Sequence, residues 1–130
     1  MSNKLAEISK KMTGKYAYAY TTHLDAEKST KTSLTLNSVK ATGHGKKCLL
    51  MCWGAIRATS LTARLTVCVN GKDSCSGITS STSYVPVFDS NIITLPEGEN
   101  TIEIRLSAQA NTATAYIGRY HKLGFIVAEL

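Results

Sequence analysis

The sequence predicts an all-β fold: an antiparallel β-sandwich of jelly-roll type, preceded by a short N-terminal helix or arm. About eight segments alternate apolar and polar residues with the period of two that a strand requires, and polar turns separate them. Ser, Thr and β-branched residues are abundant, while prolines number only 2. A chain of 130 residues with 43% hydrophobic residues holds one domain. We therefore expect an N-terminal segment, residues 1–15, and a sandwich, residues 16–130.

One segment, Asn3–Thr13, has helical spacing. Leu5, Ile8 and Met12 recur three and four residues apart, and Gly14 follows as a candidate C-cap. Three turns are marginal in isolation, so this apolar stripe must pack on something. Docking on a partner or a short trimeric bundle is one interpretation, and a frayed terminus is the other.

The positive charge lies in the N-terminal third. Residues 1–47 hold nine lysines and three acidic residues, which accounts for the whole formal net charge of +6. Lysine ammonium groups suit contact with a broad acidic surface. Lys10, Lys11 and Lys15, next to the apolar stripe, are therefore the predicted attachment residues; charge that only confers solubility is the alternative.

A row of tyrosines opens the β part of the chain. Tyr16, Tyr18 and Tyr20 are separated by two alanines, which places the three rings on one face of a strand. Such a row suits an interface or a sugar-stacking platform. The alternative is that it packs on the core of its own sheet.

The next segments continue the alternation. Thr21–Lys31 is polar and charged and predicts a loop. Thr32–Thr42 predicts a strand with a one-residue slip between Leu36 and Val39, and a glycine-containing turn follows at residues 43–47.

Two segments are apolar on both parities. These are Cys48–Ala58 and the C-terminal run Leu123–Leu130. An antiparallel sandwich of this size leaves one face of each sheet in water, so a strand that is apolar on both faces predicts that a second subunit covers it.

The middle of the chain predicts a hairpin followed by a loop. Leu61–Val69 alternates with Leu61 facing inward, and Asn70-Gly71 favours a tight turn because both residues tolerate positive φ. Lys72–Ser83 is rich in Ser and Gly and predicts a mobile loop.

The last third predicts several short strands. Tyr84–Phe88 and Ile92–Leu95 are two candidates, with Pro86 marking a sheet edge. Thr101–Ala108 alternates clearly, and Ala113–Leu130 supplies one or two final strands that end inside a sheet.

The four cysteines predict buried, unreactive thiols. Cys48 and Cys52 lie four apart on one strand, a spacing that does not suit a zinc site. Cys68 and Cys75 flank the hairpin and could bridge, but the expected compartment keeps thiols reduced.

Catalytic patterns are absent from the sequence. No histidine is spaced to serve a nucleophile or a second metal ligand, and the carboxylates near one turn indicate a solvated face: His23, His44, His121, Glu97, Glu99 and Glu103. We therefore expect no enzyme, no catalytic residue, no metal and no cofactor. No apolar run is long enough to cross a bilayer, so no membrane partner is expected. Nucleic acid is disfavoured, because the domain beyond residue 47 is electrically neutral.

A family resemblance rests on four phrases: the apolar strand Lys47–Ala58, the hairpin Val67-Cys-Val-Asn-Gly71, the run Leu95-Pro-Glu-Gly-Glu-Asn-Thr-Ile-Glu-Ile104, and the final strand Leu123–Leu130. Over residues 32–130 this pattern resembles the small trimeric jelly rolls related to tumour-necrosis-factor-like domains. Versions of these serve as head-fibre, decoration and receptor-binding modules of tailed bacteriophages. The pattern also looks like the carbohydrate-binding β-sandwich modules.

The first resemblance implies a structural protein of a virion, assembled in the host cytoplasm, which agrees with the lack of an export signal in this sequence. It implies a homotrimer attached to a larger assembly such as a capsid. The predicted attachment or interface residues are Leu5, Ile8, Lys10, Lys11, Met12, Lys15, Tyr16, Tyr18 and Tyr20. The alternative is a carbohydrate- or receptor-binding module.

Overall fold

The computed structural model describes residues 17–24, 26–118 and 122–130, and the regular structure within them is β-strand. Sheet A contains β1 (Ala17–His23), β2 (Lys28–Thr30), β4 (Lys46–Ala58), β7 (Val85–Leu95), β9 (Ala115–Ile117) and β10 (Lys122–Glu129). Sheet B contains β3 (Ser33–Gly43), β5 (Ala63–Val69), β6 (Lys72–Thr79) and β8 (Gly98–Ala108). Eight of these strands are long, and β2 and β9 have three residues each.

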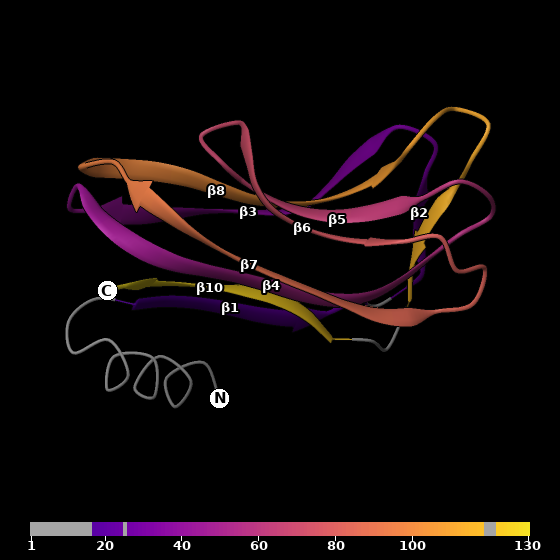
Figure 1. The fold of residues 1–130 in the computed structure, drawn as a ribbon, viewed down its shortest axis with the longest axis horizontal. Coiled ribbons are helices and arrows are strands. Elements are labelled where there is room, and N and C mark those ends of the chain that lie inside the picture. The colour runs from indigo at the N-terminus through magenta and orange to yellow at the C-terminus, as the bar shows by residue number, and fades with distance from the viewer. Residues whose placement is uncertain (1–16, 25, 119–121) are drawn as a thin grey trace.

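The two sheets are stacked as layers, with sheet B above sheet A in Figure 1. The long strands of sheet A have the order β1-β10-β4-β7, and those of sheet B the order β3-β8-β5-β6. All pairings are antiparallel, and the connections β3–β4, β4–β5, β6–β7 and β7–β8 each pass from one sheet to the other. This is a jelly-roll sandwich, and the predicted fold class is confirmed.

The core fills the space between the layers. One parity of each central strand points inward and is almost completely buried: Leu50 and Ile56 on β4, Leu65 and Val67 on β5, Ile102, Ile104 and Leu106 on β8, and Leu123 and Phe125 on β10. These strands come from both sheets, so segments far apart in the described sequence contribute to the same core.

Two local predictions are confirmed. Asn70 and Gly71 adopt φ of 52° and 81°, so both residues of the β5–β6 turn have the positive φ of a tight hairpin. The slip in β3 is a β-bulge: Thr35 pairs with Arg105 and Asn37 with Ile104, which leaves Leu36 between them unpaired.

The predicted loop Lys72–Ser83 is wrong over most of its length, because Lys72–Thr79 forms β6 at the edge of sheet B. Small residues are needed where this edge meets β7. A Cβ on Gly77 would lie 2.8 Å from the Val87 Cβ, so only glycine allows this approach. The composition of β6 resembles that of a loop because its close contact with β7 requires small residues.

Three further boundaries differ from the prediction. Residues 85–95 form one strand, since β4 offers a continuous partner from Lys46 to Ile56, and Pro86 lies on this edge strand as predicted. The predicted loop Thr21–Lys31 contains the end of β1, which pairs along β10, and the short β2. Leu61 does not face inward: it lies in the turn before β5, with φ of 55°.

The helix and attachment predictions at the N-terminus lie outside the described residues. They concern Asn3–Thr13 and, among the attachment residues, Leu5, Ile8, Lys10, Lys11, Met12, Lys15 and Tyr16. Within one chain, the inner face of Cys48–Ala58 is buried and its outer face is half-buried. The prediction that a second subunit covers the outer face stays a prediction.

Candidate interaction surface on sheet A

The outer face of sheet A is apolar across four neighbouring strands. On β4 the residues that point away from sheet B are Leu49, Met51, Trp53 and Ala55, and all are half-buried. The strand register places apolar residues beside them: Ile126 and Ala128 on β10, Ala19 on β1, and Phe88 and Ile92 on β7. We call this set the sheet A outer face.

The most exposed part of this face is on the edge strand β7. Phe88 is 61% exposed and Ile92 is 58% exposed. Phe88 is opposite Trp53, and Ile92 is opposite Leu49, so the exposed edge is continuous with the half-buried centre. Large apolar side chains gathered on one sheet face are typical of a contact surface.

Trp53 lies against its own sheet. A Cβ on Gly124, its register partner, would come within 2.7 Å of the Trp53 ring atom Cζ2 and within 2.2 Å of the Tyr20 carbonyl oxygen. Gly124 is therefore required at this point, and it lets the indole lie over β10 instead of standing away from the sheet.

Charges are confined to the ends of this face. In the rows of Leu49, Met51 and Trp53, the polar residues are Thr21, beside Gly124, and Ser90, beside Met51. Lys122, which has the parity of Gly124 and is exposed, lies beyond the Trp53 row on β10. Lys47 follows at one end of β4 and Arg57 at the other. An apolar centre between cations favours a neutral, apolar partner surface.

The Arg57 end is a packed aromatic cluster. The guanidinium carbon lies 3.9 Å from the centre of the Tyr116 ring and 5.4 Å from that of Tyr84. The Tyr84 hydroxyl donates a hydrogen bond to the Glu27 carboxylate. Burial, and then this hydrogen bond, raise the pKa of Tyr84 to about 12.

Tyr18 and Tyr20 point the other way. They pair with Val127 and Phe125 on β10, and each stacks on the Phe125 ring, with centroids 6.0 and 5.7 Å apart. Both are half-buried and pack against the core, which favours core packing over an interface for these two tyrosines. The actual apolar surface, with Phe88 and Ile92, was missed by the sequence analysis.

The outer face of sheet B is polar by contrast. Its residues are Ser33, Thr35, Ser38, Lys40, Thr101, Glu103, Arg105, Ser107, Arg64, Thr66, Cys68, Ser76 and Ile78. Arg105 pairs with Glu103 at 2.9 Å, and the hydroxyls of Thr66 and Ser76 are 3.0 Å apart. Ile78, 50% exposed, is the large apolar exception. We call this set the sheet B outer face.

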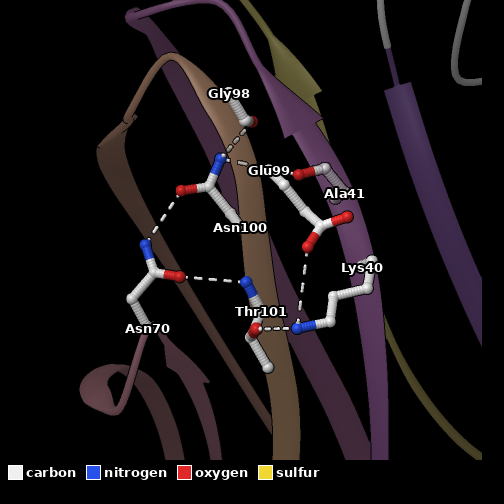
Figure 2. Close-up of polar contacts among 7 residues, drawn as sticks. All are labelled: Lys40, Ala41, Asn70, Gly98, Glu99, Asn100 and Thr101. Atoms are coloured by element: carbon white, nitrogen blue, oxygen red, sulfur yellow. Dashed lines mark hydrogen bonds and ion pairs between the residues drawn. The ribbon is translucent and has the colours of Figure 1, made fainter.

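A buried asparagine organises one end of sheet B (Figure 2). The Asn100 side chain, 1% exposed, donates from Nδ2 to the carbonyls of Pro96 and Gly98 at 2.8 and 3.0 Å. Its Oδ1 accepts from Asn70 Nδ2 at 2.8 Å, and Asn70 Oδ1 accepts from the Thr101 amide at 2.9 Å. The β7–β8 turn and the β5–β6 turn are thereby joined.

Lys40 extends this network to the surface. Its ammonium donates to the Thr101 hydroxyl at 2.6 Å and lies 3.9 Å from Glu99 (Figure 2). The segment Leu95–Ile104 thus contributes to a polar cluster with a structural role.

The described residues offer no metal site. No group of three or more His, Cys, Asp or Glu side chains in that part of the chain could hold a metal ion. The four cysteines are free and buried. Cys68 and Cys75 are not bridged: the Cys68 thiol donates to Asp73 at 3.2 Å, whereas Cys75 points into the core. Nor does any helix there have the length and apolarity of a membrane span.

Comparison with known proteins identifies the fold alone. No protein-family description and no curated protein matches the sequence. Murine APRIL, a tumour-necrosis-factor-like protein, has 14% identity over 88% of this chain and 100% of its own, with a TM-score of 0.56. The VP2 subviral particle of infectious bursal disease virus has 12% identity over 88% of this chain, also with a TM-score of 0.56. This chain spans only 32% of VP2.

A carbohydrate-binding module, CBM36, is similar at 15% identity over 82% of this chain and 97% of its own, but with a TM-score of 0.47. The chain is therefore a jelly roll of the kind also found in tumour-necrosis-factor-like and viral capsid proteins.

Proposed function

We propose that this protein is a non-enzymatic structural module of a virus particle, as a capsid decoration or head-fibre protein of a tailed bacteriophage. Three copies associate through the sheet A outer face. The basic segment, residues 1–15, attaches the trimer to a larger assembly such as a capsid. Assembly takes place in the host cytoplasm, and no nucleic acid or membrane is bound.

The sheet A outer face carries this proposal. Its Leu49, Met51 and Trp53 rows expose apolar side chains on four strands and have no charged residue. A charge-free apolar surface is complementary to an equally charge-free one, and a second copy of this chain supplies such a surface. The sheet B outer face, with its ion pairs, then faces solvent.

Attachment is assigned to the N-terminal segment because of its charge. Lys10, Lys11 and Lys15 lie beside the stripe Leu5, Ile8 and Met12. Lysines suit a broad acidic surface, and the apolar stripe provides area for contact. Pull-down of purified capsid particles should therefore weaken as salt rises, and deletion of residues 1–15 should abolish it while leaving the trimer intact.

The first test is the solution mass measured by light scattering. The wild-type chain is expected at three times 14.0 kDa. Ile92→Asp places a charge on the sheet A outer face and should shift the mass to that of one chain. Ile78→Asp is the matched control, because Ile78 is similarly exposed but lies on the sheet B outer face. It should leave the mass unchanged.

Two results would refute a trimer built through the sheet A outer face. A wild-type monomer that associates only after residues 1–15 are deleted would mean that the chain's own N-terminal segment covers the sheet. A trimer that survives Ile92→Asp but not Ile78→Asp would place the interface on sheet B.

A second candidate, carbohydrate binding, rests on the same surface. Trp53 and Phe88 lie side by side in the strand register, and aromatic faces stack on sugar rings. Trp53 is the single tryptophan of the chain, so its fluorescence reports on this surface alone. Quenching by glycans at micromolar concentration, lost in Phe88→Asp, would favour this candidate over the structural one.

A further inference from the structure

Two of the four cysteines face each other across the sandwich. Cys52 is on β4 in sheet A and Cys75 on β6 in sheet B, and their Sγ atoms are 3.3 Å apart. They are 1% and 4% exposed. The other two thiols have different partners: Cys48 donates to the Lys46 carbonyl at 3.5 Å, and Cys68 donates to a carboxylate.

Hydrogen bonds between the edge strands hold Cys75 in position. Its two neighbours in sequence are both tied to β7. The Ser76 amide donates to Asp89 Oδ2 at 2.9 Å, and Asn91 Nδ2 donates to the Ser74 carbonyl at 2.8 Å. Asp89 is in turn the register partner of Cys52 on β4. The backbone on both sides of Cys75 is thus fixed next to sheet A.

A β-bulge in β6 aims the Cys75 side chain. Val67 pairs with Cys75 and Cys68 with Asp73, so Ser74 is the extra residue between them. Cys75 shares the inward face with Val67, while Cys68 lies on the opposite face. The bulge therefore points Cys75 toward Cys52 across the sandwich and away from Cys68 across the hairpin.

We propose that Cys52 and Cys75 are a modification site: a reversible disulfide that forms between the two sheets when the folded protein meets a peroxide or a small-molecule disulfide. A disulfide has an S–S distance of about 2.0 Å, so the sulfur atoms approach by about 1.3 Å. Side-chain rotation with a small shift of the edge strand β6 supplies that movement.

The reaction with hydrogen peroxide balances in two steps. The Cys52 thiolate attacks one oxygen, the O–O bond breaks, and the released hydroxide takes up the thiol proton as water. Cys52 is then a sulfenic acid. The Cys75 sulfur attacks it, the S–O bond breaks, and a second water leaves with the Cys75 proton. The two sulfurs give up two electrons, which reduce the peroxide.

The pKa directions agree with these roles. The hydrogen bond from Cys75 lowers the pKa of Cys52, against the effect of burial. The same hydrogen bond, together with burial, raises the pKa of Cys75. Cys52 is the thiol that ionises first, and Cys75 is the resolving thiol. Burial, and then the hydrogen bond to Asp73, raise the pKa of Cys68 to about 11, which disfavours it as a competitor.

The edge position of β6 provides access. β6 pairs with β5 alone and β7 with β4 alone among the described strands, so this side of the sandwich opens without breaking a central strand. Oxidation then links the sheets and slows further opening. The two cysteines are 23 residues apart, and the unfolding equilibrium constant should fall about three hundredfold.

The test uses the full chain, treated with hydrogen peroxide under native conditions. Remaining thiols are alkylated in denaturant, and the unreduced digest is analysed by mass spectrometry. The expected product is a Cys52–Cys75 linked peptide that dithiothreitol releases, with Cys48 and Cys68 alkylated. The oxidised protein should also have a higher urea midpoint.

Variants separate this pair from general oxidation. Cys75→Ser should abolish both the linked peptide and the rise in the urea midpoint, whereas Cys68→Ser should retain both. The proposal is overturned if wild-type Cys52 and Cys75 remain alkylated at peroxide levels that oxidise the methionines. It is equally overturned if the main link is Cys68–Cys75 or joins two chains. These outcomes are read from the wild-type protein and do not depend on a variant folding.

Discussion

The outer faces of the two sheets differ although both are built from the same alternation. On β8, in the centre of sheet B, the outward residue Thr101 accepts a hydrogen bond from Lys40, and the outward residues Glu103 and Arg105 form an ion pair. On β4, the centre of sheet A, the outward residues Met51 and Trp53 are apolar. A polar outward parity indicates a face that water covers, and an apolar outward parity indicates a face suited to contact.

The largest expected effect is on the sheet A outer face. Gly124→Ala brings a Cβ within 2.2 Å of the Tyr20 carbonyl oxygen and 2.7 Å of Trp53 Cζ2. Because the first of these atoms is backbone, it cannot move away cheaply. We expect a loss of about 3 kcal/mol in the free energy of unfolding, measured by urea denaturation.

Ser38→Ala on the exposed sheet B outer face is the control for Gly124→Ala, and its unfolding free energy should change by less than about 0.5 kcal/mol. Equal stability of the two variants would mean that Trp53 does not need to lie flat on β10.

The next largest loss of stability is expected for an inward polar residue of sheet B, in comparison with an outward one. Asn100→Ala removes a buried group that satisfies the Pro96 and Gly98 carbonyls and Asn70. Leaving these groups without partners should destabilise the protein by about 2 kcal/mol in urea denaturation. Lys40→Ala, which removes a neighbouring outward contact, should cost less than about 0.5 kcal/mol. A larger loss from Lys40→Ala would reverse this ranking.

The fold could be predicted from the sequence because it depends on local patterns. Alternation marks the inward residues Ile102 and Ile104, and the β3 slip and the Asn70-Gly71 turn are local features too. The strand β6 could not be predicted in this way. Its small residues are explained only by their contact with β7. That strand belongs to the other sheet and meets β6 only when the two sheets pack together.

The candidate site depends on longer-range register and was missed for that reason. Phe88 and Ile92 were assigned to separate strands, and only their pairing with Trp53 and Leu49 places both on one face. A signal was available: Pro86, Phe88, Ser90 and Ile92 share one parity. The Cys52–Cys75 contact joins two sheets, and no spacing in the sequence indicates it.

A pH-dependent effect tests the Arg57 end of sheet A. Burial and the hydrogen bond to Glu27 raise the pKa of Tyr84 to about 12, against 10.0 for an ordinary tyrosine. The folded state therefore holds this proton more tightly than the unfolded state. The resulting stability is complete below about pH 10 and is lost as the pH rises through about 12.

Tyr84→Phe removes that proton, so the difference in urea midpoint between wild type and variant should shrink from pH 9 to pH 12. A constant difference across this range would show that Tyr84 titrates as it does in the unfolded chain.

The smallest effect is expected where the sheet B outer face meets solvent. Arg105 Nη2 lies 2.9 Å from Glu103 Oε1, and the Arg105 side chain is 33% exposed. A partly exposed ion pair between neighbours on one strand contributes little, because water solvates the separated charges well. Arg105→Ala should therefore lower the unfolding free energy by about 0.5 kcal/mol and leave the mass in solution unchanged. A loss of association in this variant would mean that the sheet B outer face also contacts a partner. Both faces would then be contact surfaces, one apolar and the other polar.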